Sequence, residues 1–318
     1  MDELRAACAE VARRARSVRI VPDAIAPYAA SLAPPGAGSA GGSGDSGPEG
    51  SRAERAAYWL GLDAINFGSG WFPTLRKPEG SGYATIAAAW RRRHEAEGPF
   101  SAAELAALDA PAVAAMLGQD PAHELMGLFA LSLRDLGIRL LDGYDGSPLA
   151  LVDAAGSSAA SLVGELGGWP CFADRSRYQV GDRDPQAGHS DLEELSLPFL
   201  KRAQIAAADL QRAGVADWTD AGRLTMFADN LVPHVLRLDG VLEFDAALVA
   251  RIDSGELIEH GSPEEVEIRA CAVEAVERIV AARGAPAIAA AIDQLLWQRG
   301  QGERYKASPR HRSRSTAY

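Results

Sequence analysis

Two charged side chains lie inside segments that otherwise have the pattern of buried chain. Lys201 lies near the start of the apolar run FLKRAQIAAADL, and Asp229 lies in the middle of LTMFADNLVPHVLR. A cation or a carboxylate that loses its water is costly unless it gains a partner or has a chemical task. Lys201 and Asp229 are therefore candidates for a chemical task, and the functional interpretation depends mostly on them.

Each of these charges also has a structural interpretation, which the sequence leaves open. Asp229 could cap the helix that contains Val232 to Arg237, and a capping role is compatible with a catalytic one. Lys201 could extend its apolar stem along the surface, with Arg202 as its solvent-facing neighbour. Arg237, at the end of its helix, would face the negative end of the helix dipole.

A glycine-rich loop, NFGSGWF, carries side chains suited to a flat ligand. Aromatic rings such as those of Phe67 and Trp71 stack on flat ligands, including nucleobases. Asn66 offers both a donor and an acceptor to the edge of a base or a ribose. Core packing is the alternative interpretation of the same aromatic residues.

Basic residues gather at the end of the chain, in the segment SPRHRSRSTAY. His311 lies there among three arginines. A disordered basic end is one interpretation, and a tail that folds back to line an anion site is the other. Trp297, in the helical segment IDQLLW, is interpreted as either core or pocket wall, with core slightly favoured.

The composition excludes several classes of function. The net charge of −11 disfavours stable nucleic acid binding, which needs a basic face. The sequence has no phosphate-binding or dinucleotide-binding glycine motif, and none of the common zinc or serine hydrolase motifs. Its 6 histidines are scattered. We expect no metal, no cofactor and a small-molecule substrate.

Cysteine usage and the distribution of apolar residues bear on the compartment. The 3 cysteines, an odd number without a C-x-x-C motif, indicate reduced thiols. The charged N-terminus lacks the apolar segment of a signal peptide, and no apolar run is long enough for a membrane span. We expect a cytoplasmic protein that does not bind membranes.

Helical patterns run through most of the chain, and regular strand alternation is absent. We predict an all-α fold in a single domain over residues 1–318, with a flexible Gly/Ser/Pro loop at 34–50. Residues 169–191 are expected to be irregular. The segment LRLDGVLEFDAALVARI is expected to form a helix, a tight turn at Asp239-Gly240 and a second helix with Asp245 as its N-cap. Ser262-Pro263-Glu264-Glu265 is the clearest predicted helix start.

Five stretches, in the same order along the chain, resemble one known family. They are SVRI, YWLGLDAINFGSGWFP, LPFLKRAQIAAADL, LTMFADNLVPHVLRLDGVLEF, and IDQLLW with the H-R-x-R tail. Together they resemble the queuosine salvage protein family, the queuosine 5′-phosphate N-glycosylases. The chain departs from that family in its Gly/Ser/Pro loop, at residues 169–191, and in reading FADNL where some members have FADYR.

The resemblance implies a fold, a reaction and roles for residues. The fold would be similar to that of helix-hairpin-helix DNA glycosylases. The reaction would be hydrolysis of queuosine 5′-monophosphate to queuine and ribose 5-phosphate, for queuine salvage into tRNA. The hairpin-like turn has Asp239 where DNA-binding hairpins usually have proline, which disfavours a polymer substrate.

Roles follow from the chemistry of an N-glycosidic bond, whose cleavage builds positive charge on the ribose. Asp229 would stabilise that charge or activate water. Lys201 would keep Asp229 ionised or bind the anionic side of the substrate. Around the base we expect Asn66, Phe67 and Trp71.

For the phosphate we expect Arg237, His311 and the tail arginines. Two alternative functions remain open at this point: a glycosylase for another nucleoside or for DNA, and a non-catalytic helical module that binds a base or a nucleotide.

Overall fold

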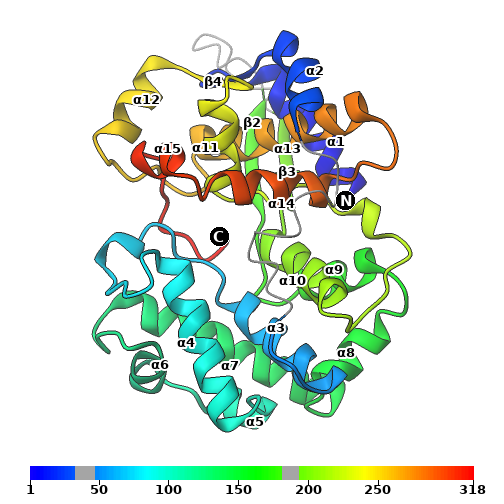
Figure 1. Cartoon of the computed structure of the whole chain (residues 1–318), viewed down its shortest axis with the longest axis vertical. Coiled ribbons are helices and arrows are strands. Elements are labelled where there is room, and N and C mark those ends of the chain that lie inside the picture. The colour runs from blue at the N-terminus through cyan, green and yellow to red at the C-terminus, as the bar shows by residue number, and fades with distance from the viewer. Residues whose placement is uncertain (33–46, 181–192) are drawn as a thin grey trace. The chain divides into compact units, whose positions relative to one another are not determined.

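Helices dominate the structure (Figure 1). The structure, a computed structural model, describes residues 1–32, 47–180 and 193–318. Within these residues, strands form two short antiparallel pairs, β1 with β4 and β2 with β3. The predicted all-α class is therefore confirmed, with these two ribbons as additions. Residues 34–46 of the predicted loop at 34–50 lie outside the described residues.

The chain divides into two compact units, each of which is assembled from three separate stretches. Unit 1 comprises Met1–Gly44, Arg175–Phe199 and Gly222–Arg314, and unit 2 comprises Asp45–Asp174, Leu200–Ala221 and Ser315–Tyr318. Because both units are discontinuous, neither corresponds to a single continuous piece of the sequence. The single domain over residues 1–318 stays a prediction.

Unit 1 contains the two strand pairs and seven of the described helices. Its helices are α1 (Asp2–Arg14), α2 (Pro22–Ser31), α11 (Leu231–Leu238), α12 (Ala246–Asp253), α13 (Pro263–Arg283), α14 (Ala289–Arg299) and α15 (Glu303–Ala307). Its strands are β1 (Val18–Ile20), β2 (Ser176–Val180), β3 (Glu193–Leu197) and β4 (Leu242–Phe244).

Helix α13 is the central helix of unit 1 (Figure 1). It packs against α1, α2, α11 and α14 and is buried on most of its circumference. Its buried residues include Val266, Ala270 and Val273, and also the charged residues Glu265, Glu267 and Arg269. The predicted start is confirmed, because the Ser262 side chain accepts the amide of Glu265. The carboxylate of Glu265 accepts the amide of Gly261, the residue before the cap, at 3.1 Å.

A buried carboxylate on α13 holds the start of β1. Oε2 of Glu267 accepts the backbone amides of Arg16, Ser17 and Val18 at 3.0, 2.7 and 3.2 Å. Oε1 accepts the Tyr178 hydroxyl at 2.8 Å. These four donors satisfy a charge that would otherwise be costly to bury. Glu267 is therefore a structural residue of unit 1.

The predicted helix, tight turn and second helix of LRLDGVLEFDAALVARI are confirmed, with a short strand before the second helix that was not predicted. Helix α11 ends at Leu238, Gly240 makes the turn with a φ of +77°, and Leu242–Phe244 form β4. β4 pairs with β1, with Ile20 opposite Leu242. A strand of three residues whose partner lies more than 200 residues away leaves no periodic signal in the local sequence. Asp245 caps α12, as expected.

The expected irregular segment at 169–191 is partly wrong. Ser176–Val180 form β2, which pairs with β3 in a register that places Tyr178 opposite Leu195. Residues 181–191 of that segment lie outside the described residues.

Unit 2 is helical in its described part. Its α-helices are α3 (Arg52–Ala64), α4 (Gly82–Glu97), α5 (Ala102–Ala107), α6 (Ala110–Leu117), α7 (Glu124–Tyr144), α8 (Pro148–Ala154), α9 (Ala159–Leu166) and α10 (Lys201–Arg212), with a short 3-10 helix at Phe72–Thr74. Helix α7 packs against α3, α5, α6 and α8, and α10 packs against α3 and α9. Lys201 begins α10, at the helix pair α3–α10.

The length and apolar content of the helices bear on membrane insertion. Among the helices of the described ranges, none combines the length and the apolar content that crossing a bilayer requires. The likeness to helix-hairpin-helix DNA glycosylases stays a prediction.

Candidate active site

Lys201 is buried at the first turn of α10, with 5% of its surface exposed. The turn before it is fixed by Leu200, whose φ is +48°, and by Asp174, whose Oδ2 accepts the Lys201 amide at 3.0 Å. Lys201 Nζ donates to the backbone oxygen of Asn66 at 2.9 Å and to its Oδ1 at 3.2 Å. The interpretation of Lys201 as an extended surface lysine is therefore wrong.

Arg202 is also buried, so it is not the solvent-facing neighbour that was expected. Its Nη1 donates to the carbonyl of Ala64 at 2.5 Å, and its guanidinium lies 4.8 Å from the ring centroid of Phe67 and 5.8 Å from that of Phe172. Burial lowers the pKa of Arg202 to about 10, which leaves it charged at neutral pH. Arg202 thus holds the end of α3 against α10.

Asp63, one turn before Asn66, was not predicted as a site residue. It is fully buried, and burial followed by the negative charge of Asp209 raises the pKa of its carboxyl group well above the usual range. The cations Lys201 and Arg212 act in the opposite direction. The signal in the sequence was a carboxylate inside the apolar run YWLGLDAI, the same signal that singled out Asp229.

The aromatic residues of the NFGSGWF loop are packed inside unit 2. The Phe67 ring meets the Phe129 ring edge-on, with 4.9 Å between the centroids. Trp71 Nε1 donates to Glu124 at 2.7 Å. Both rings are buried, which supports the core-packing interpretation. Their stacking on a base stays a prediction.

The same loop turns at Gly68, where the backbone has a φ of +109°. A Cβ there would lie 2.8 Å from Leu125, so only glycine fits without displacement. The Gly68 amide donates to the backbone oxygen of Tyr318 at 3.1 Å. Residues Ser315–Tyr318 therefore belong to unit 2 and support this loop.

In unit 1, Asp229 caps helix α11. Its Oδ1 accepts the amides of Leu231 at 2.8 Å and Val232 at 3.1 Å, so the capping interpretation is confirmed. The guanidinium of Arg310 lies within electrostatic range of this carboxylate. A carboxylate at a helix N-terminus is stabilised by the helix dipole. Asp229 is thus held in one orientation, which fits either role considered for it.

The tail of unit 1 is folded against α11 instead of being disordered. The side chain of Asn230 donates to the backbone oxygen of His311 at 3.1 Å. His311 is buried, and burial lowers its pKa to about 3, which keeps the imidazole neutral at neutral pH. His234 Nε2 lies 2.9 Å from the Tyr305 carbonyl, so Nε2 carries the proton, and burial lowers the pKa of His234 to about 4.

The two remaining predicted site residues also lie in unit 1. Arg237 donates to the carbonyl of Pro309 at 3.0 Å and lies 5.5 Å from the ring centroid of Phe244. Trp297 packs against the hydrophobic core, as favoured from the sequence. Arg237 therefore holds the tail, and a substrate contact for either residue stays a prediction.

The structure thus groups the predicted residues by unit. Asn66, Phe67, Trp71 and Lys201 belong to unit 2, and Asp229, Arg237, Trp297 and His311 belong to unit 1. Lys201 is in direct contact with Asn66, whereas a pairing of Lys201 with Asp229 stays a prediction. Among the described residues, no group of three His, Cys, Asp or Glu side chains is placed to hold a metal ion.

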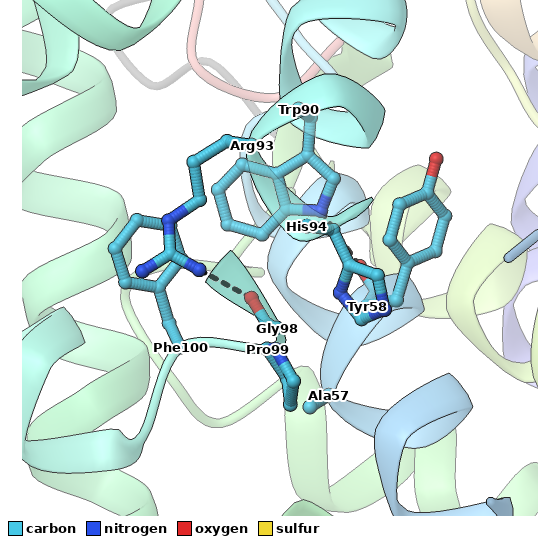
Figure 2. A pocket seen from close by; sticks show the side chains of 8 residues that line it. All are labelled: Ala57, Tyr58, Trp90, Arg93, His94, Gly98, Pro99 and Phe100. Atoms are coloured by element: carbon cyan, nitrogen blue, oxygen red, sulfur yellow. Dashed lines mark hydrogen bonds between the residues drawn. The ribbon is translucent and has the colours of Figure 1, made fainter. Parts of the chain in front are cut away.

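Two cavities of unit 2 hold none of the predicted site residues. One, of about 10 Å³, lies between Tyr58, Trp90, His94 and Phe100, where Arg93 donates to the Gly98 carbonyl (Figure 2). It is about as large as one water molecule requires. The other, of about 380 Å³, is a groove along α7 lined by residues such as Leu131 and Arg134.

Comparison with known proteins places this amino-acid sequence in a family. The queuosine salvage protein family matches residues 47–318. A queuosine 5′-phosphate N-glycosylase/hydrolase of Sphaerobacter thermophilus is 35% identical over 276 residues, which cover 83% of this chain and 81% of that protein.

Two eukaryotic relatives with the same name are matched over shorter regions. The Dictyostelium discoideum protein is 32% identical over 58% of this chain and 56% of its own length. The Mus musculus protein is 32% identical over 46% of this chain and 41% of its own length. The family match covers both structural units, including the segments of Lys201 and Asp229. The chain therefore belongs to the queuosine salvage protein family.

Proposed function

We propose that this protein hydrolyses the N-glycosidic bond of queuosine 5′-monophosphate, releasing queuine and ribose 5-phosphate for queuine salvage into tRNA. The observation that carries the proposal is the match to the Sphaerobacter thermophilus queuosine 5′-phosphate N-glycosylase/hydrolase over most of both chains. Lys201, buried at the start of α10, and Asp229, half-buried before α11, are the two charged residues predicted to carry this chemistry.

Asp229 is the proposed catalytic carboxylate. As the bond to the base breaks, positive charge develops on the ribose, and an oriented carboxylate stabilises it and activates the attacking water. The two backbone amides that bind Oδ1 fix the orientation of Asp229 before substrate arrives. Such preorganisation is what electrostatic catalysis requires.

Lys201 is the proposed cation for the reaction. The two hydrogen bonds to Asn66 limit where its ammonium group lies. An ammonium group that is already fixed binds an electron-rich part of the substrate more tightly than a mobile ammonium group would. The reason is that the lysine side chain loses less conformational entropy on binding. Asn66 is proposed to contact the base or ribose, with Phe67 and Trp71 supporting the wall behind it.

Arginine is the proposed ligand type for the 5′-phosphate. His311 is neutral at neutral pH, so among the tail residues the arginines supply the charge that a phosphate needs. Arg310 carries such a charge beside Asp229. Arg237 is assigned to the same site, and Trp297 is assigned to its apolar wall.

We also propose a cytoplasmic reaction on a free nucleotide. The three cysteines, all described, are free and buried, which suits a reducing compartment. The net charge of −11 supports a small substrate over DNA or RNA.

Release of free base from queuosine 5′-monophosphate, followed by chromatography, tests the proposal. We expect release by the wild type, with ribose 5-phosphate as the second product in equal amount. A tRNA that contains queuosine and a DNA duplex with a modified base serve as polymer substrates. Binding of the nucleotide without release would favour a binding module, and release from the duplex would favour a DNA glycosylase.

A further inference from the structure

The backbone that leads into Asp229 is held by side chains from two other helices of unit 1. The carbonyl of Ala228, in the peptide bond to Asp229, accepts Nε of Arg269 on α13 at 2.9 Å. The amide of Phe227 donates to Oδ1 of Asp293 on α14 at 3.0 Å. Both hydrogen bonds are buried, so water is not at hand to replace either of them. They therefore restrict the backbone from which the Asp229 side chain projects.

The guanidinium group of Arg269 is itself held on two sides. Its Nη1 lies 3.5 Å from Oε1 of Glu265, one turn earlier on α13, and both side chains are fully buried. Its central carbon lies 4.0 Å from the centroid of the Phe199 ring. Glu265 in turn accepts the amide of Gly261 at 3.1 Å. Few orientations are therefore open to the guanidinium group, and the observed one directs Nε at the Ala228 carbonyl.

Net stability alone gives little reason for an ion pair at this position of α13. Replacing a buried ion pair by apolar side chains of similar volume is often neutral or stabilising. Neighbouring buried positions of the same helix, such as Val266 and Ala270, are apolar. An apolar side chain in place of Arg269 would remove the donor of the bond to the Ala228 carbonyl. The arginine therefore points to a requirement at the backbone next to Asp229.

We propose that Arg269 is a positioning residue, which binds the Ala228 carbonyl and thereby sets the direction of the Asp229 carboxylate. The proposal rests on the proposed function, in which Asp229 stabilises the charge on the ribose. Arg269 is fully buried, so it acts through the backbone and not by touching substrate. Its effect on the rate follows from geometry, because a misplacement of about 1 Å in a catalytic group can lower the rate on the order of 10²-fold.

A matched pair of variants isolates the bond to the Ala228 carbonyl. Both carry Glu265→Gln, so that no buried charge is left without its partner, and they add either Arg269→Met or Arg269→Gln. Glutamine has a nitrogen the same number of bonds from the backbone as arginine Nε, whereas methionine has no donor there. The methionine variant should lower kcat for base release by about tenfold, with KM within about twofold of the wild type. The glutamine variant should restore kcat to within about threefold of the wild type.

Hydrogen exchange supplies a readout that needs no substrate. The amides of Leu231 and Val232 donate to Oδ1 of Asp229, so their protection reports whether this carboxylate is held. They should exchange about tenfold faster in the methionine variant than in the glutamine variant. The amide of Val21, which donates to the Val241 carbonyl at 2.9 Å, is the control in the same unit and should exchange equally in both. An equal increase at all three amides would reflect overall stability and would count against the proposal.

Equal kcat in the folded methionine and glutamine variants would overturn the proposal, as would equal exchange at Leu231 and Val232. If the methionine variant does not fold, Arg269→Lys in the otherwise wild-type chain replaces it. Lysine keeps the charge beside Glu265 and has a methylene group where arginine has Nε, so the same loss of kcat is expected, and a wild-type kcat would contradict the proposal. Failure of the wild type to release base would instead contradict the proposed function, and the exchange measurement would still decide the role of Arg269.

An Asp229→Asn background separates action through Asp229 from any other route. If Arg269 acts only through that carboxylate, the effects of the two residues on kcat are not additive. The difference of about tenfold between methionine and glutamine at position 269 should shrink to less than about twofold in that background. An undiminished difference there would show that Arg269 serves turnover by another route, against the proposal.

Discussion

Lys201 Nζ donates to both oxygens of Asn66, at 2.9 Å to the backbone and 3.2 Å to the side chain. The two residues are separated by 135 positions in the sequence and are joined where α10 packs on the end of α3. This contact holds the buried ammonium group of Lys201 against the loop that also carries Phe67 and Trp71. It makes Asn66 a determinant of where the ammonium group lies.

Asn66→Ala should lower kcat/KM by about tenfold or more, because a hydrogen bond to a charged group contributes roughly 1.5–3 kcal/mol. The backbone oxygen of residue 66 remains, so Lys201 keeps one acceptor and the protein should fold. Steady-state base release at several nucleotide concentrations measures the effect. Gln119→Ala is the control, since Gln119 binds only backbone groups in the described bonds of the same unit. A similar loss in both variants would indicate general loosening.

Asp229→Asn separates the two roles of Asp229. The asparagine Oδ1 retains an acceptor for the amides of Leu231 and Val232, so thermal stability should change little. Turnover should fall by about 10²-fold or more, because the negative charge is lost. Asp229→Ala should lose the cap as well, at a cost of about 1 kcal/mol. An active Asp229→Asn protein would reduce Asp229 to a helix cap.

Arg310 should matter for the phosphate and not for the nucleoside. Arg310→Gln removes a charge near Asp229, so KM for the 5′-monophosphate should rise by about tenfold, while KM for the nucleoside stays within about twofold. Arg304→Gln is the matched control, because Arg304 lies outside the SPRHRSRSTAY tail and donates to the Leu238 carbonyl at 2.6 Å. Equal changes for nucleotide and nucleoside would point to destabilisation of the tail.

Two buried histidines predict a loss of stability in acid. Burial lowers the pKa of His234 to about 4 and that of His311 to about 3, below the ordinary value near 6.5. The unfolded chain therefore binds more protons than the folded chain at acidic pH. Stability is complete above about pH 6.5 and falls toward pH 4, by roughly 2 kcal/mol per histidine at pH 5.

Urea denaturation at pH 7 and pH 5 measures this dependence. His311→Gln should lower stability at pH 7 and reduce the difference between the two pH values, because one titrating group is removed. His123→Gln is the control, since His123 lies in unit 2 and is partly exposed. An unchanged pH dependence in His311→Gln would contradict the assignment.

The sequence by itself determined the helical class, several helix starts and the two charges of interest. Ser262, Asp245 and Asp229 act as caps because capping needs only residues within one turn. The apolar runs around Lys201 and Asp229 marked both residues as costly to bury. The same rule, applied to YWLGLDAI, would have marked Asp63.

The tertiary structure decided what depends on residues far apart in the chain. Strand β4 forms because Leu242 meets Ile20, and β2 forms because Tyr178 meets Leu195. The burial of Arg202 and the bond between Lys201 and Asn66 depend on how α10 packs on α3. Long-range packing determines the hydrogen-bond partners of each charged side chain and how far it is removed from water. It therefore decides which charged side chains are buried and held in one orientation.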